Sequence, residues 1–141
     1  MTRGKKLLIA VDGSGNSLRA ISYAIKRTAA DKRLHIYVLN VQPALPHSLF
    51  VTRAMIASHQ ETRSKEALLS ANRMLVKRNV GAEIAVRVGN EAETIVNFAR
   101  RNRCAEIIMG TRGLGSVKGL LLGSITTRVI HLARVPVTVV P

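Results

Sequence analysis

The sequence predicts an α/β fold: a single doubly wound domain in which helices cover both faces of a five-stranded, Rossmann-like parallel sheet. Short, almost fully apolar segments alternate along the chain with segments whose apolar residues recur at the helical period. The strand-like segments are apolar on both faces, as strands buried between two helical layers are. The chain has 141 residues, 47% of them apolar, which suffices for one core and not for two domains. We therefore expect one domain over residues 1–141.

The first half of the chain predicts two strands and two helices. A strand is expected over 6–11 (KLLIAV), where an apolar run ends at the turn residues DGSG. The helical period starts near Ser17, with one apolar stripe made by Leu18, Ile21, Ala24, Ile25 and Thr28. A second strand over 34–41 is ended by prolines. A long helix over about 52–78 follows, with Leu68, Ala71 and Leu75 inward and with Met55 and Met74 as core filler.

A third strand is expected over 82–88, ended by Gly89. Asn90 and Glu93 form a capping-box-like start for a helix that runs through Ala99.

The last third of the chain predicts a strand over 105–109, a glycine-rich stretch over 110–122, a short helix over 124–133 and a final strand over 135–140. One face of the short helix is expected to hold Ile125, Val129 and Leu132. The final strand is a candidate sheet edge with valine on both faces, and an exposed apolar edge favours pairing with another chain.

In open parallel sheets, ligands bind beyond the carboxyl ends of the strands, near the point where the strand order reverses. In this chain those ends carry Asp12-Gly13, Val41-Gln42, Gly89 and Gly110-Thr111.

The charge balance allows two interpretations. With 22 Lys and Arg against 8 Asp and Glu, the net charge is +14, which suits either a solvated surface or attraction to polyanions such as nucleic acid. Two Tyr, two Phe and no Trp give few stacking platforms, which argues against a binder of single strands. The single cysteine, Cys104, excludes a disulfide framework, fits a reducing cytoplasm and is expected to be a small packed residue. No apolar run has membrane-helix length, and no cleavable signal is expected.

Gly13-Ser14-Gly15, directly after the first strand, is similar to a dinucleotide-binding turn but lacks one requirement. The third small residue of that motif is replaced by Leu18, which prevents close packing of helix on strand. A P-loop is also absent from the sequence. Either a tight strand-to-helix turn or a direct ligand contact would explain the two glycines.

A second glycine pattern is more specific, because Gly110-x-x-Gly113 follows an apolar strand and Gly123-Ser124 opens a helix nine residues later. Glycines at a strand end let backbone amides approach a sugar and phosphates, and a helix start presents unpaired N–H groups to an anion. The Ser124 hydroxyl could donate to a ligand or cap the helix, and Arg112 could meet phosphate charge.

Two further features have two interpretations each. The Asp12 carboxylate could accept hydrogen bonds from a ribose or an amine, or help to hold Mg²⁺, or simply bond its own turn. The segment 42–59 could be a flap over the pocket or a plain surface loop.

The string MGTRGLGSVKGLLLGS at 109–124 resembles the ATP-binding signature of the universal stress protein family. The resemblance extends along the chain, through the strand end Val11-Asp12-Gly13-Ser14, the strand end Leu39-Asn40-Val41, Gly89, and the start of the last strand at Val135-Pro136-Val137. Thr111, where serine is common, keeps the hydroxyl.

The resemblance implies binding of ATP, ADP or AMP, with Mg²⁺ as a possible companion and Asp12 as its weak ligand candidate. It implies that Asp12 and Val41 hold the adenine end, that Gly110 and Gly113 follow the ribose and first phosphate, and that Gly123 and Ser124 hold the phosphates. It also implies a homodimer through the last strand, Val137 to Val140. The full set of expected nucleotide-binding residues is Val11, Asp12, Gly13, Ser14, Val41, Met109, Gly110, Arg112, Gly113, Gly115, Gly123, Ser124 and Ile125.

The function we expect is that of a cytoplasmic, homodimeric stress-response sensor, in which nucleotide orders the glycine loop and changes a surface seen by a partner protein. No catalytic residue is assigned. A slow ATPase or nucleotidyl-transfer enzyme and a basic nucleic-acid-associated protein remain the alternatives.

Overall fold

The computed structural model describes residues 4–48, 50–114 and 121–141. It confirms the predicted fold class: all described strands are parallel and form one sheet of five in the order β3-β2-β1-β4-β5. Strands and helices alternate along the chain as β1 (Lys6–Ala10), α1 (Gly15–Ala30), β2 (His35–Gln42), α2 (Arg53–Lys77), β3 (Ala82–Val88), α3 (Glu91–Arg101), β4 (Glu106–Gly110), α4 (Ser124–Leu132) and β5 (Val137–Val140).

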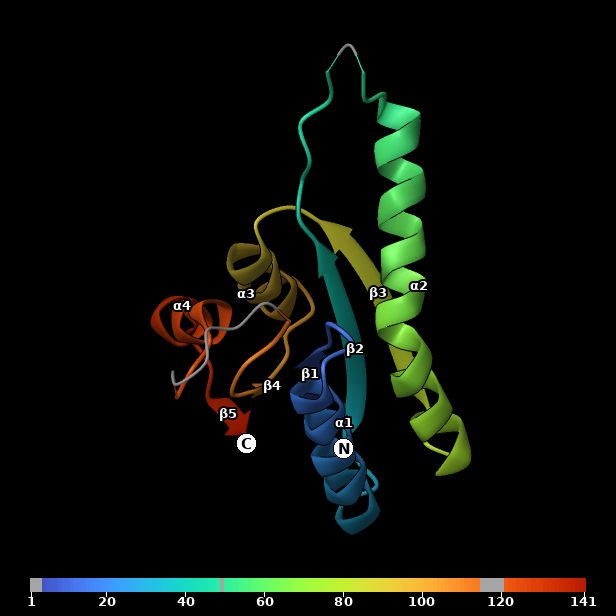
Figure 1. Cartoon of the computed structure of the whole chain (residues 1–141). Helices are drawn as coiled ribbons and strands as arrows, with labels where there is room; N and C mark the ends of the chain where they lie inside the picture. The colour runs from blue at the N-terminus through green and yellow to red at the C-terminus, as the bar shows by residue number, and fades with distance from the viewer. Residues whose placement is uncertain (1–3, 49, 115–120) are drawn as a thin grey trace.

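Helices cover both faces of the sheet (Figure 1). Helices α1 and α2 lie on one face and α3 and α4 on the other. The strand order reverses between β1 and β4, because the chain first builds outward through β2 and β3 and then returns to the other side of β1. The carboxyl ends of β1 and β4 therefore flank the switch point, where ligands bind in folds of this kind.

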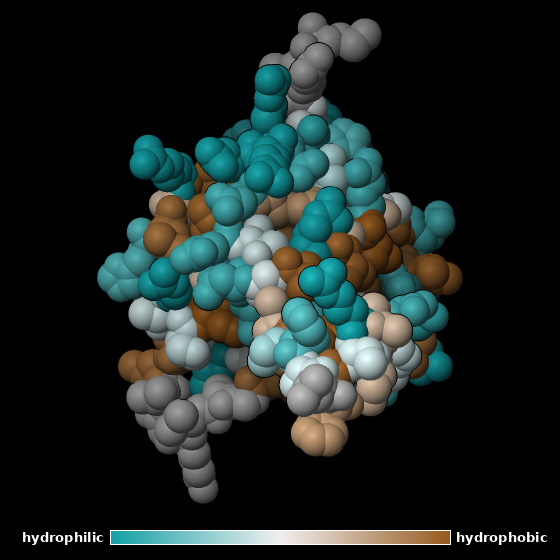
Figure 2. Space-filling view, turned by 90° about the horizontal axis from the view of Figure 1, so that it is seen from above, coloured by the Kyte–Doolittle hydropathy of each residue, from teal (hydrophilic) through white to brown (hydrophobic). Residues whose placement is uncertain are grey.

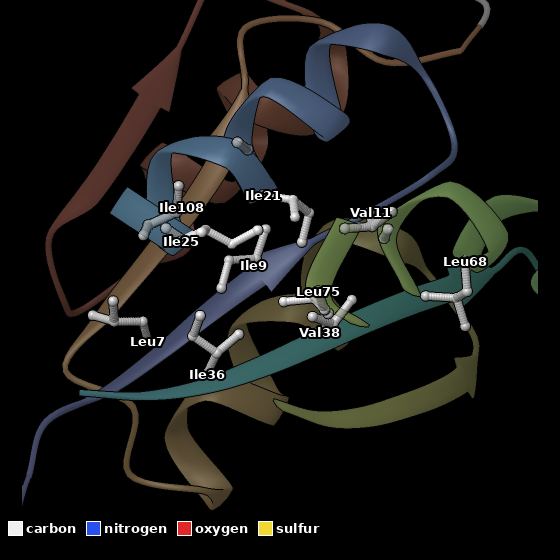
Figure 3. Close-up of a cluster of buried hydrophobic side chains, with 13 residues drawn as sticks. Leu7, Ile9, Val11, Ile21, Ile25, Ile36, Val38, Leu68, Leu75 and Ile108 are labelled. Atoms are coloured by element: carbon white, nitrogen blue, oxygen red, sulfur yellow. The ribbon is translucent and has the colours of Figure 1, made fainter. Parts of the chain in front are cut away.

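The first hydrophobic layer lies between the sheet and α1/α2 (Figure 3). Its buried side chains are mainly aliphatic and branched, which suits the flat, two-sided burial of a parallel sheet. Its members include Leu7, Ile9, Val11, Ile21, Ile25, Ile36, Val38, Leu68, Leu75 and Ile108. The inward positions predicted for the long helix, Leu68, Ala71 and Leu75, are confirmed.

The second hydrophobic layer lies between the sheet and α3/α4. It holds Phe98, whose ring meets Tyr37 edge to face with the centroids 5.7 Å apart, and the buried thiol of Cys104. Cys104 is therefore a packed residue, as predicted, and its burial raises the pKa of the thiol. Val129 on α4 is also fully buried.

Helix α2 is supported along only part of its length. Its buried residues begin at Ser64, and Figure 1 shows its first half rising away from the sheet beside the segment that leads up from β2. Met55 lies in this free part and is 54% exposed, so its predicted role as core filler is wrong, whereas Met74 packs against the first layer as predicted. Leu132, expected on the inner face of α4, is also exposed at 37%.

The positions at which the helices start are set by their capping residues and not by where the apolar periodicity begins. Helix α1 begins at Gly15, because the Ser14 side chain accepts a hydrogen bond from the Ser17 amide at 3.2 Å. Asn90 caps α3 by accepting from the Glu93 amide at 3.1 Å, as predicted. The Glu93 carboxylate pairs with Arg128 of α4, and this contact takes the place of the second half of the expected capping box.

None of the helices in the described ranges is both long enough and apolar enough to cross a membrane.

Candidate functional site

A cleft opens at the switch point, between the carboxyl ends of β1 and β4 and the start of α4. It encloses about 660 Å³ of space, part of it open solvent. Ten of the residues predicted to bind a ligand line it: Val11, Asp12, Val41, Met109, Gly110, Arg112, Gly113, Gly123, Ser124 and Ile125.

Three of the predicted residues are placed elsewhere. Gly13 lines a second hollow that adjoins the cleft. Ser14 is not among the lining residues and caps α1 instead, which explains its side chain without a ligand. Gly115 lies outside the residues that the structure describes.

Asp12 ties two loops together at one end of the cleft. Its Oδ1 accepts a hydrogen bond from the Ser14 amide at 2.9 Å, which is the local turn considered in the sequence. Its Oδ2 accepts from the Leu114 amide at 2.8 Å, a residue 102 positions away in the chain. The same carboxylate thus holds both its own turn and the end of the glycine-containing loop.

The first two glycines of the pattern are required by contacts within the protein. A Cβ on Gly113 would lie 2.2 Å from Asp12 Oδ2, and a Cβ on Gly110 would lie 2.7 Å from backbone and side-chain atoms of Asn16. These glycines allow the loop and the start of α1 to approach closely, and that approach forms the floor of the cleft. Their explanation is therefore partly structural, which the sequence did not indicate.

The start of α4 is the one helix start among the described residues without a side-chain cap. Its N-cap is Gly123, whereas α1, α2 and α3 are capped by Ser14, Thr52 and Asn90. Ser124 is the first residue of α4 and is exposed, so its hydroxyl does not cap the helix. The first-turn amides and the positive end of the helix dipole therefore face the cleft, an arrangement that favours an anion.

Backbone and side-chain hydrogen bonds fix this helix start against β4. The Gly123 amide donates to the Thr111 carbonyl at 2.7 Å, and the buried Thr126 hydroxyl donates to the Gly110 carbonyl at 3.0 Å. Thr126 also lines the cleft.

Sequence reasoning missed Glu91, which lines the cleft from the first turn of α3. Burial raises the pKa of Glu91, and the negative charge of Asp12 raises it further. The sequence did contain a signal, because Glu91 lies three residues after the carboxyl end of β3, at the edge of the sheet where ligand-contacting residues are expected.

Asn40 was missed as well. It is buried, and its Nδ2 donates to the Val11 carbonyl at 2.7 Å, while its Oδ1 accepts from Gln42 Nε2 at 2.8 Å. This amide fixes the chain at the point where β1 leads into Asp12.

The cleft lining carries groups of both signs. Asp12, Val41 and Glu91 line both the cleft and the second hollow, as do Leu114 and Ile125. Arg112, Gly123 and Ser124 line the main cleft. The lining therefore offers hydrogen-bond acceptors together with a cation and amide donors.

The segment after β2 lies outside the lining of the main cleft. No described residue from 42 to 59 is among its lining residues, whereas Gln42 and Pro43 line the adjoining second hollow. Figure 1 shows the segment beside α2, whose first turns hold residues 53 to 59. Figure 2, which shows the molecule from above, has hydrophobic surface in view between hydrophilic side chains. The two interpretations, a flap over the pocket and a plain surface loop, both stay predictions.

Comparison with known proteins agrees with this architecture. Residues 4–141 match the universal stress protein family. A universal stress protein of Methanocaldococcus jannaschii is 33% identical over 138 residues, covering 96% of this chain and 81% of that protein.

The chain belongs to the universal stress protein family.

Solved structures of universal stress proteins share the fold. One in complex with cAMP has a TM-score of 0.73 at 23% identity, with 99% of each chain covered. Another, from Archaeoglobus fulgidus in complex with dAMP, has a TM-score of 0.71 at 22% identity, with 100% of each chain covered. These solved structures share the fold over the whole chain.

Proposed function

We propose that this universal stress protein is a single nucleotide-binding domain that takes an adenine nucleotide, ATP or its products ADP and AMP, in the cleft between β1 and β4. The observation that carries the proposal is the convergence of Asp12, Val41, the glycine loop and the uncapped start of α4 on one cavity. The cAMP and dAMP complexes of similar proteins support adenine as the base.

The chemistry of the lining groups favours one orientation of the nucleotide. Adenine and ribose carry hydrogen-bond donors that suit the acceptors of Asp12 and Val41. The phosphates suit Arg112 and the first-turn amides of α4, because both present positive charge to an anion.

The described residues do not fit a Mg²⁺ ion held by the protein itself. Among them there is no group of three or more His, Cys, Asp or Glu able to hold a metal ion. Both oxygens of Asp12, the predicted metal ligand, already accept amide hydrogen bonds.

We propose a sensing role rather than turnover. A ligand group that takes over Asp12 Oδ2 must replace its hydrogen bond to Leu114, so occupancy of the cleft is coupled to the attachment of the loop. Both oxygens of Asp12 are engaged by backbone amides, so this carboxylate holds the loop and is not free to activate water, which supports sensing. The cytoplasmic location stays a prediction.

The proposed homodimer forms through β5, which is an edge strand. Val139→Arg should lower the mass in solution by disrupting the β5 pair, because it places a charge on the paired strand. Light scattering after size exclusion measures this, and an unchanged dimer mass for the variant would exclude the β5 interface.

The binding proposal is tested with Gly123→Val. Its branched side chain would occupy the part of the cleft proposed for the phosphates, because a Cβ added at position 123 would lie 3.3 Å from Arg112 Cα. We expect AMP and ATP affinity, measured by calorimetry, to fall at least about tenfold, the equivalent of 1.4 kcal/mol. The matched control is Gly81→Val, because a Cβ there has no atom within 4 Å. Full affinity in a folded Gly123→Val protein would contradict the proposed site.

A further inference from the structure

The outer edge of the sheet at β3 has an uncovered apolar face. Ile84, Val86 and Val88 are 43%, 41% and 52% exposed, although each is a large aliphatic residue in a strand. They lie on the same face as Ala82, which packs against the first layer, but α2 packs against β2 and leaves them uncovered. Edge strands with an exposed apolar row are prone to pair with another chain.

The backbone on this edge is open too. The Gly89 amide donates to the Gln42 carbonyl, so alternate residues back along β3, including Ala85 and Arg87, direct their amides and carbonyls toward β2. Ile84 and Val86 therefore direct theirs away from the sheet. The Val86 carbonyl accepts a hydrogen bond from Arg87 Nη1 at 2.9 Å, which is the contact expected of an acceptor that has no strand beside it.

The charges of β3 are arranged symmetrically about its centre. The strand reads AEIAVRV, with Glu83 two residues before Ala85 and Arg87 two residues after it. All three lie on the face that carries α3, since Arg87 lies over the Phe98 ring and Ala85 packs in the second layer. In an antiparallel pair of two such strands centred on Ala85, each Glu83 lies opposite the Arg87 of the other copy.

We propose that β3 is a self-association edge, on which a second copy of this chain pairs antiparallel about a two-fold axis at Ala85. The pairing places Glu83 opposite Arg87 twice, and Ile84 opposite Val86 twice. It also joins the outward amides and carbonyls of Ile84 and Val86 into a hydrogen-bonded ladder and covers the exposed aliphatic row. This interface is distinct from β5, which lies at the other end of the sheet.

Cysteine scanning tests the register directly. Residues that face each other in a non-hydrogen-bonded antiparallel pair have Cα atoms about 4.5 Å apart, which a disulfide can span. Ala85→Cys should therefore form a covalent dimer under mild oxidation with diamide. Val88→Cys is the control: it is more exposed than Ala85, yet in this register the two Val88 positions lie roughly 20 Å apart. The native Cys104 is buried and is common to both variants.

Charge reversal tests whether the paired Glu83 and Arg87 side chains favour association of the two copies. In the Ala85→Cys background, Glu83→Lys should slow cross-linking on the order of tenfold, because two opposite-charge pairs become like-charge pairs. Adding Arg87→Glu reverses both charges together and should restore the rate. Both positions are exposed, so the fold tolerates the changes.

Equal cross-linking of Ala85→Cys and Val88→Cys, no cross-linking of Ala85→Cys, or no recovery in the double charge reversal would each overturn the proposal. Because no nucleotide is present and β5 pairing does not bring the Ala85 positions together, these outcomes are independent of the proposed function.

Discussion

The two hydrophobic layers of this universal stress protein differ in what they support. The layer under α1 and α2 is a closed core, and among the described residues only Val11 of its buried members reaches the cleft. The layer under α3 and α4 contributes Leu39, Ile95 and Met109 to the cleft wall. The same side chains thus act as core on one side and as binding surface on the other. Substitutions in the first layer should change stability alone, and those in the second should change stability and binding together.

The largest effect is expected in the first layer, from Ile108→Ala. Ile108 on β4 is fully buried against α1, so its truncation leaves a cavity and should cost about 2–5 kcal/mol of unfolding free energy. Urea unfolding followed by circular dichroism measures the loss. AMP affinity of the folded protein should stay unchanged, and a parallel loss of affinity would show that the layers are not separate.

The next residue along the strand gives the matched comparison. Met109 is 6% exposed and packs in the second layer while lining the cleft. Met109→Ala should cost about 2–3 kcal/mol, at the lower end of the range for such truncations because one side already opens on the cleft. It should also weaken AMP binding several-fold in calorimetry. Wild-type affinity in this variant would remove Met109 from the proposed binding surface.

A smaller effect is expected from Glu91→Gln, which changes charge and leaves packing unaltered. The Glu91 carboxylate repels a bound phosphate, so its removal should strengthen AMP binding about twofold to fivefold, the size of a screened interaction between single charges.

The same substitution predicts a pH dependence. Burial and the Asp12 charge raise the pKa of Glu91, so the residue takes up its proton at a higher pH than an ordinary glutamate does. The uncharged form no longer repels phosphate, and wild-type affinity should therefore rise as the pH is lowered through the titration of Glu91. The rise should be smaller in Glu91→Gln, which serves as the control for the titration of other groups. Equal pH profiles of the two proteins would exclude Glu91 as the titrating group.

Much of the fold was predictable from the sequence because burial on both faces produces unmistakable apolar strands, as in β1 and β4. The helix starts were predicted less well, since the Ser14 cap fixes the start of α1 at Gly15, two residues before the start predicted near Ser17. Met55 was predicted to be buried because it lies in a helical segment. Only the tertiary arrangement shows that the buried residues of α2 begin at Ser64, which leaves Met55 exposed.

The site was predictable where its residues lie at the carboxyl ends of strands, as Asp12 and Gly110 do. The contacts that require glycine at 110 and 113 join segments about a hundred residues apart. Local sequence patterns therefore do not predict them. Glu91 was missed because only its neighbours Asn90 and Glu93 were singled out, as capping residues of the helix.

The partial support of α2 has a consequence for local opening. A helix of 25 residues extends about 37 Å, yet its buried side chains begin only at Ser64. The amides from Arg53 to about Arg63 are protected by the helix alone, so they should exchange with deuterium through fraying at low free-energy cost. Those near Ala71 and Leu75 should exchange only when the whole domain unfolds. Protection from exchange should therefore increase along α2 from its N-terminal to its C-terminal half.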